Sequence, residues 1–240
     1  MFREQYIKNQ QMIKFNFFHL ICIICSALFL SCTNNKTSKE HTTVSADTAK
    51  AAVASTSGTT NILFFGTSLT AGMGVDPEQA FPALIQKKID SIKAPYKVIN
   101  AGLSGETSAD GKNRIDWLLR QPVAIFVLEL GANDGLRGIP VKETINNLQV
   151  IIDKVKKKYP DVKLILAGMQ MPPSMGEQYT VSFRALFPAL AQKNKMELVP
   201  FLLKDVAGIH SLIQQDGLHP NPKGHQILAE NVWTILQPIL

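Results

Sequence analysis

Cysteine is absent from most of this chain. The 240 residues contain three cysteines, Cys22, Cys25 and Cys32, and all lie within the first 32 positions. The long segment after them therefore offers no thiol nucleophile, no internal disulfide and no cysteine-based metal site. Cys22 and Cys25 form a C-x-x-C pattern inside an apolar run, where two small apolar residues are a better interpretation than a redox or metal site.

Basic charge is not concentrated in the way that a nucleic-acid-binding surface requires. Charged residues make up 18% of the chain and the formal net charge is +6. The cluster at Lys154–Lys158 has no aromatic residues between its lysines, so we expect a solvated helix face and no nucleic-acid partner. Hydrophobic residues make up 45%, which is enough for one sizeable core.

The longest apolar run is short for a bilayer span. Phe15–Leu30 covers about 16 residues after a basic start, whereas a spanning helix needs roughly 20. We therefore predict a signal peptide over residues 1–31. The run ends in L-F-L-S-C, which resembles a bacterial lipobox with Cys32 as the lipidated residue, although Leu30 stands where a smaller residue is usual. Plain secretion and an uncleaved anchor are the alternatives.

Aromatic residues are missing from positions 33–60, which are rich in Ser, Thr, Ala, Asn and Lys. Such a segment cannot bury enough apolar surface to fold, so we predict a flexible tether over residues 32–60. Together, the two N-terminal segments predict an exported protein. A lipid on Cys32 would anchor it to a membrane, facing the periplasm or the cell surface.

Residues 61–240 alternate between short apolar runs and helix-like stretches. The apolar runs are Ile62–Phe65, Lys97–Ile99, Ala124–Leu128, Lys163–Ala167 and Glu197–Val199. The helix-like stretches are Ala80–Ile92, Ala109–Arg120, Lys142–Lys158, Val181–Lys195 and Lys223–Leu236. This alternation predicts one α/β domain, a three-layer α/β/α sandwich in which helices cover both faces of an open five-stranded parallel sheet.

Four short segments follow predicted strands and carry the polar residues that acyl transfer requires. They are Gly66–Thr70, Ser104–Ser108, Gly131–Asp134 and Asp216–Pro220. The carboxyl ends of parallel strands meet at one edge of a sheet, so we expect these four segments to converge there.

Ser68 is the candidate nucleophile, and a serine hydroxyl needs a neighbouring base. His219 follows Asp216 by three residues, close enough for the carboxylate to hold one ring nitrogen, so this pair is the candidate base and its orienting acid. His210 has no acidic residue within four positions. His225 falls on the last predicted helix, where we expect a surface imidazole.

The oxyanion of a tetrahedral intermediate needs fixed donors. The candidates are the backbone N–H groups of Ser68 and Gly105 and the side-chain amide of Asn133. Residues 133–135 also have the composition of a turn, and both interpretations can hold. Ser104 is the rival nucleophile, and the chain contains no G-x-S-x-G.

These ordered segments resemble the SGNH hydrolases, also called GDSL esterases. The family supplies Ser, Gly, Asn and an Asp-x-x-His pair in this order, here Ser68, Gly105, Asn133 and the pair Asp216 and His219. N-A-G-L-S-G-E-T-S, G-A-N-D-G-L-R-G and Q-D-G-L-H-P-N are similar to the branch of thioesterase I, lysophospholipases and arylesterases. One departure is Thr67, which stands where the family's G-D-S-L block has Asp and which brings a hydroxyl but no charge.

The resemblance implies a flavodoxin-like fold and a serine esterase that cleaves lysophospholipid, fatty-acyl or aryl esters or thioesters, without metal or cofactor. It implies a mobile flap over Gly135–Pro140 and a groove lined by Leu136, Ile139, Met169, Met171, Pro172, Pro173 and Met175, for which core packing near a loop is the alternative. We also expect a monomer. A carbohydrate acetylesterase of the same superfamily is the first alternative. A non-catalytic binding lipoprotein that keeps the fold is the second.

Overall fold

A computed structural model describes residues 60–240, which fold around one parallel sheet. The predicted signal peptide, the lipidation site at Cys32 and all but the last residue of the predicted tether lie outside the described residues. The five strands, all parallel, are β1 (Thr60–Gly66), β2 (Tyr96–Gly102), β3 (Ile125–Glu129), β4 (Lys163–Ala167) and β5 (Glu197–Val199). Their order is β2-β1-β3-β4-β5, so the predicted flavodoxin-like sheet is confirmed.

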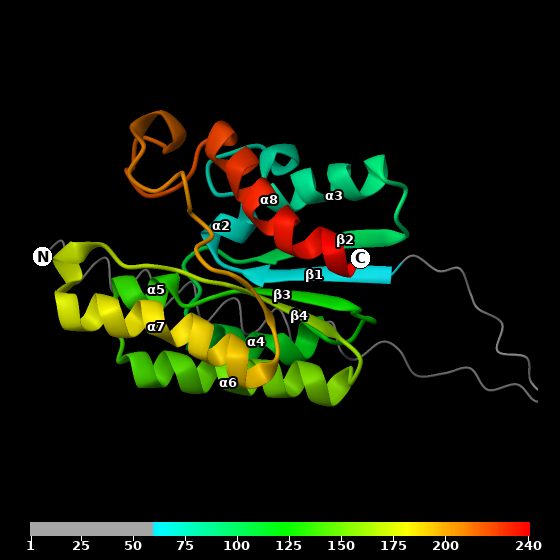
Figure 1. The fold of residues 1–240 in the computed structure, drawn as a ribbon, viewed down its shortest axis with the longest axis horizontal. Helices are drawn as coiled ribbons and strands as arrows, with labels where there is room; N and C mark the ends of the chain where they lie inside the picture. The colour runs from blue at the N-terminus through cyan, green and yellow to red at the C-terminus, as the bar shows by residue number, and fades with distance from the viewer. Residues whose placement is uncertain (1–59) are drawn as a thin grey trace, which may run out of the picture. The chain divides into compact units, whose positions relative to one another are not determined.

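Helices cover both faces of the sheet and make the three predicted layers (Figure 1). One face carries α3 (Phe81–Ser91) and α8 (Pro222–Leu236), which pack against each other. The other face carries α4 (Ser108–Leu118), α6 (Val141–Lys158) and α7 (Glu177–Asn194). Among the helices of residues 60–240, none combines the length and the apolar content that a bilayer span requires.

The core explains why these segments form these elements. All five residues of β3 are buried, as expected of a central parallel strand with helices on both faces. Helix α6 buries one apolar stripe, which includes Leu148, Ile151, Ile152 and Val155, and exposes the lysines of its last turn. Each such side chain contributes roughly 1.5–3 kcal/mol of burial free energy.

Helix boundaries shift by up to four residues from the sequence prediction. Helix α7 begins at Glu177, four residues before the predicted start at Val181. The prediction missed this first turn because the turn is polar and carries no periodic apolar signal. Two short helices were not predicted, α2 (Ser68–Ala71) and α5 (Ala132–Leu136). Four 3₁₀ turns complete the described elements, at Pro77–Gln79, Pro173–Met175, His210–Leu212 and Gln237–Ile239.

Strand order fixes where a site can lie. The chain leaves β1 toward β2 on one side and leaves β3 toward β4 on the other, so the connections diverge between β1 and β3. A crevice forms at such a switch point, outside the carboxyl ends of the strands. Gly66 at the end of β1 pairs with Glu129 at the end of β3, and the segments that follow them flank this crevice.

Candidate active site

Ser68 lies at the corner where β1 gives way to α2. It is the first residue of this four-residue helix and its surface is 9% exposed. The sequence predicted a strand-to-loop corner, and the structure replaces the loop with one helical turn. The Oγ atom of Ser68 lies 2.9 Å from Nε2 of His219. A residue 151 positions away along the chain is therefore brought within hydrogen-bond distance of the serine hydroxyl.

Asp216 and His219 occupy an exposed loop that precedes α8. The Nδ1 atom of His219 lies 2.6 Å from Oδ2 of Asp216, and Oδ1 of Asp216 accepts hydrogen bonds from the backbone N–H groups of His219 and Leu218. These backbone bonds, together with the imidazole, lower the pKa of Asp216 to about 2. An ionised carboxylate at Nδ1 holds the proton there, which leaves Nε2 as the acceptor that faces Ser68.

Gln214 supports this loop and was not recognised in the sequence. Its backbone N–H donates to the carbonyl of His219, and its side-chain amide donates to the carbonyls of Met73 and Pro220, each at 2.8 Å. Met73 follows α2, so Gln214 joins the serine side of the site to the histidine side. Gly74 permits this approach, because a Cβ there would lie 2.1 Å from the Gln214 amide oxygen. No motif in the sequence marks such a bridge.

The three candidate oxyanion donors face one space. Among residues 60–240, the backbone N–H groups of Ser68 and Gly105 have no hydrogen-bond acceptor. Gly105 adopts a φ of 81°, which favours glycine. The amide of Asn133 donates one N–H to the carbonyl of Glu106 at 2.9 Å, and this bond orients the side chain. Its second N–H is left for a ligand.

Buried acids hold the loops that carry these donors. Glu106 directly follows Gly105 in the chain, is 3% exposed and accepts two hydrogen bonds from the guanidinium of Arg114. Asp134 directly follows Asn133 in the chain, is fully buried and accepts hydrogen bonds from the backbone N–H and the hydroxyl of Ser108. The turn considered for residues 133–135 is instead the body of α5.

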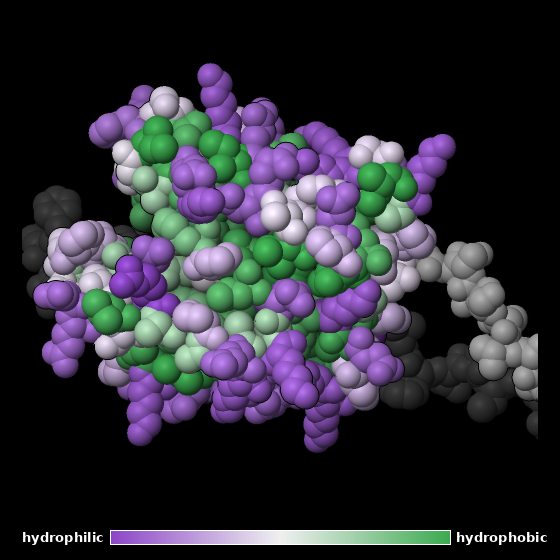
Figure 2. Space-filling view, in the orientation of Figure 1, coloured by the Kyte–Doolittle hydropathy of each residue, from purple (hydrophilic) through white to green (hydrophobic). Residues whose placement is uncertain are grey.

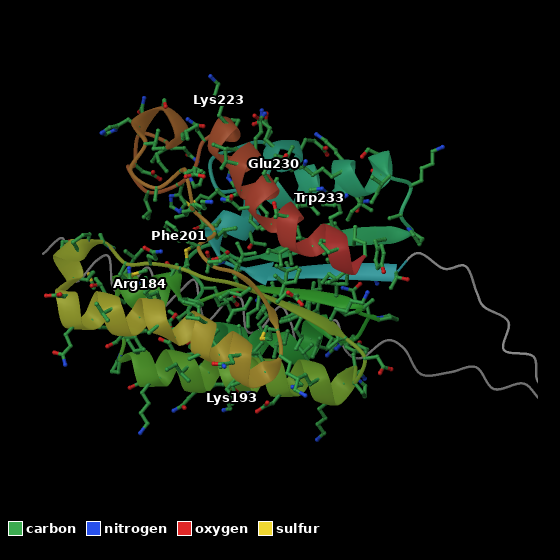
Figure 3. The ribbon with its side chains drawn as sticks, in the orientation of Figure 1. Arg184, Lys193, Phe201, Lys223, Glu230 and Trp233 are labelled. Atoms are coloured by element: carbon green, nitrogen blue, oxygen red, sulfur yellow. The ribbon has the colours of Figure 1, made fainter. Side chains whose placement is uncertain are left out.

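A cavity of about 840 Å³ opens beside Ser68 and His219. Figure 2 shows apolar surface between two lobes with polar rims. In the same orientation in Figure 1, one lobe is formed by the residues that follow β5 and the other by the start of α7. Phe201, labelled in Figure 3, lies on the segment that follows β5 and lines the cavity. No Asp, Glu, Lys or Arg lies among the lining residues.

Most of the groove residues implied by the family resemblance line this cavity. These are Leu136, Met169, Met171, Pro172 and Pro173. Ile139 and Met175 do not line it. The carbonyl of Ile139 accepts a hydrogen bond from the hydroxyl of Tyr179. Mobility of the 135–140 segment stays a prediction.

The other serine and histidines considered in the sequence do not join the group formed by Ser68, His219 and Asp216. Ser104 lines the cavity, but its hydroxyl forms no hydrogen bond within the described residues. His210 is exposed. The expectation for His225 was wrong, because it is 1% exposed where α8 packs on α3. Its Nδ1 accepts the backbone N–H of Phe81, and burial lowers its pKa to about 4.

Within residues 60–240, no cluster of His, Cys, Asp or Glu could hold a metal ion.

Comparison with known proteins gives one consistent family. The model of the GDSL-like lipase/acylhydrolase family matches residues 64–227. Esterase TesA of Pseudomonas aeruginosa is 39% identical over 180 residues, which cover 75% of this chain and 89% of that protein. Thioesterase 1/protease 1/lysophospholipase L1 of Escherichia coli is 35% identical over 180 residues, covering 75% and 84%. The esterase EstA of Pseudoalteromonas sp., solved in a form inhibited by monoethylphosphonate, superposes with a TM-score of 0.70 at 33% identity, over 75% of this chain and 97% of that one.

Proposed function

This chain belongs to the GDSL-like lipase/acylhydrolase family and hydrolyses ester or thioester bonds, and we propose that Ser68, His219 and Asp216 carry out the reaction. The observation that carries this proposal is the pair of contacts at His219. One ring nitrogen lies 2.6 Å from an ionised carboxylate and the other lies 2.9 Å from the Ser68 hydroxyl. This is the arrangement of a nucleophile, its base and the group that orients the base.

The proposed reaction has two halves. The Oγ atom of Ser68 attacks the acyl carbon while Nε2 of His219 takes its proton, and the carbonyl oxygen becomes an oxyanion. The N–H groups of Ser68, Gly105 and Asn133 stabilise this oxyanion. The imidazolium then protonates the leaving alcohol or thiol as its bond to the acyl carbon breaks. Water attacks the acyl-enzyme with His219 again as the base, and the second collapse releases the acid and restores Ser68.

The cavity favours an apolar acyl or aryl group as the substrate. Its lining carries methionines, leucines and Phe201 but no Asp, Glu, Lys or Arg, and methionines adapt to apolar groups of different shape. An acetylated carbohydrate would bring many hydroxyls that need polar partners, and this lining provides few of them. We therefore place fatty-acyl, lysophospholipid and aryl esters or thioesters ahead of acetylated sugars.

A panel of p-nitrophenyl esters and acyl thioesters from acetyl to palmitoyl tests this proposal. We expect turnover of medium or long chains, with a loss on the order of 10⁶-fold in kcat for Ser68→Ala. Ser104→Ala is the matched control, since it removes the other serine hydroxyl at the cavity and we expect it to retain most activity. Full activity of Ser68→Ala would refute the nucleophile, and activity confined to acetylated sugars would favour the carbohydrate esterase.

We further propose export and attachment to a membrane through a lipid on Cys32, with the folded domain acting as a monomer. Support comes from the basic start, the apolar run and the lipobox-like L-F-L-S-C of the N-terminal sequence. Mass spectrometry of the mature N-terminus should find an acylated Cys32. An acyl-free chain that begins well past this residue would contradict the anchor.

A further inference from the structure

A fully buried carboxylate lies directly beneath the turn that carries Ser68. Glu129, the last residue of β3, is 1% exposed. Its Oε2 atom accepts hydrogen bonds from the backbone N–H of Thr67 at 2.8 Å, the hydroxyl of Thr70 at 2.8 Å and the backbone N–H of Thr70 at 3.3 Å. Its Oε1 atom accepts the hydroxyl of Thr67 at 3.0 Å. Four donors from one short segment therefore converge on this carboxylate.

This placement is costly and no cation compensates it. Among the described residues, no Lys, Arg or His forms an ion pair with Glu129, and burial raises its pKa to about 7 against the opposing hydrogen bonds of Thr67 and Thr70. A buried charge is tolerated only where hydrogen bonds replace its hydration. Gly66 makes the space, because a Cβ there would lie 2.5 Å from Oε2 of Glu129 and 2.1 Å from the Thr70 hydroxyl. An apolar residue in place of Glu129 would avoid this cost, so its presence requires another explanation.

The bonding pattern supplies the explanation. The amides at the start of a helix have no partner within the helix. Glu129 engages the N–H groups of Thr67 and Thr70, which bracket Ser68, and the N–H of Ser68 stays free beside the cavity. The carboxylate therefore fixes the rotation of the turn. A small rotation would move Oγ of Ser68 away from His219 and would change the direction of the free N–H.

We propose that Glu129 is a positioning residue for the nucleophile, holding Ser68 in line with His219 and reserving its N–H for the oxyanion; this inference rests on the proposed role of Ser68. It also gives Thr67 a role. The hydroxyl of Thr67 donates to Glu129, whereas the Asp usual at this position would bring a second carboxyl against the first. Thr67 and Glu129 therefore act as a donor and acceptor pair beneath the nucleophile.

The test compares Glu129→Leu with Glu129→Gln in the full chain. Leucine leaves the four donors without an acceptor, and we expect kcat to fall on the order of 100-fold with KM nearly unchanged, since small displacements of reacting groups cost about this much. Glutamine can still accept at the Oε2 position and donate to Thr67, so it should restore kcat to within about tenfold of wild type.

Asn194→Leu is the matched control. Asn194 is also buried, 6% exposed, and bonds to Gln149 and to the Leu190 carbonyl on α7, and none of these three residues lines the cavity. It should lower the melting temperature without lowering kcat. A wild-type kcat for Glu129→Leu, an equal loss of kcat in the control, or failure of Glu129→Gln to rescue would each overturn the proposal.

Two further variants remove ambiguity. If Glu129→Leu does not yield folded protein, Thr70→Val removes one hydroxyl donor while keeping the shape, and a lowered kcat supports the proposal whereas a wild-type kcat overturns it. Ser68→Ala is measured alongside. Turnover by Ser68→Ala would refute the nucleophile itself, whereas an inactive Ser68→Ala with a fully active Glu129→Leu refutes only the positioning role.

Discussion

The two halves of the site are built in opposite ways. The nucleophile turn, residues 66–70, joins β1 to α2, and its side chains from Thr67 to Thr70 are buried. The acid–base loop, residues 213–220, exposes its four central residues, 215–218, and forms its own small hairpin through an Ile213–Pro220 bridge. The first half is held by the core, and the second is held by its own backbone hydrogen bonds and by Gln214.

The two carboxylates show the same contrast. Burial raises the pKa of Glu129 to about 7, whereas backbone and imidazole hydrogen bonds lower the pKa of exposed Asp216 to about 2. The exposed acid therefore stays ionised across the physiological range and can stabilise a protonated His219. The buried acid contacts the hydroxyls and amides of Thr67 and Thr70 and does not line the cavity, so it is not placed to exchange a proton with the substrate. In this account Asp216 orients and stabilises the catalytic histidine, whereas Glu129 positions the turn that carries Ser68.

The largest expected effects lie in the acid–base loop and concern activity alone. His219→Ala should lower kcat on the order of 10⁶-fold, and Asp216→Asn should cost about 10- to 100-fold less, because other contacts partly replace an orienting group. Neither should change the melting temperature by much, since neither side chain belongs to the hydrophobic core. Initial rates and thermal melts of the two variants check this. A large drop in melting temperature for either would show that the loop is not energetically separate from the core.

Breaking the bridge between the two halves should give a smaller effect. Gln214→Leu removes the donations to the carbonyls of Met73 and Pro220 while keeping side-chain volume. We expect a roughly tenfold loss in kcat, because the serine and histidine sides would no longer be fixed to each other. Stopped-flow measurement of acylation with an activated ester would report this step. An unchanged acylation rate in this variant would mean that the serine side and the histidine side are each held in place without Gln214.

The last effect leaves activity aside and concerns the pH dependence of stability, in which the buried Glu129 and the exposed Asp216 should differ. An exposed Glu titrates near 4.3, and the folded-state pKa of Glu129 is about 7, so the free energy of unfolding falls as pH rises through this window. Glu129→Gln has no such titration. Its stability relative to wild type should therefore rise between about pH 4 and pH 7, by up to about 4 kcal/mol. Urea unfolding at several pH values measures this, and a pH-independent difference would contradict the buried titration.

Hydrophobic alternation predicted the sheet, and strand order then followed the common doubly wound pattern. The bounds of β4 and β5 match the predicted runs, because apolar residues flanked by polar ones mark a buried strand locally. Convergence of the four segments followed from parallel strands ending at one edge. These predictions needed only local pattern and topology.

What the sequence did not predict depends on contacts between distant segments. Glu129 belongs to an otherwise apolar strand, and its role appears only when β3 lies beside the turn after β1. Gln214 looks like an ordinary loop residue until the loop meets Met73. His225 was expected at the surface because helical position alone does not say which face packs on α3. In each case the hydrogen-bond partners lie about 60 residues away or more along the chain.

The most direct test of the account is the site of reaction with an alkyl fluorophosphonate. The wild-type protein is treated, digested and analysed by mass spectrometry for the phosphonylated residue, with His219→Ala treated in parallel. The account predicts one adduct, on Ser68, formed far more slowly in the variant. An adduct on another residue, or equal labelling of Ser68 without His219, would contradict a serine activated by this histidine.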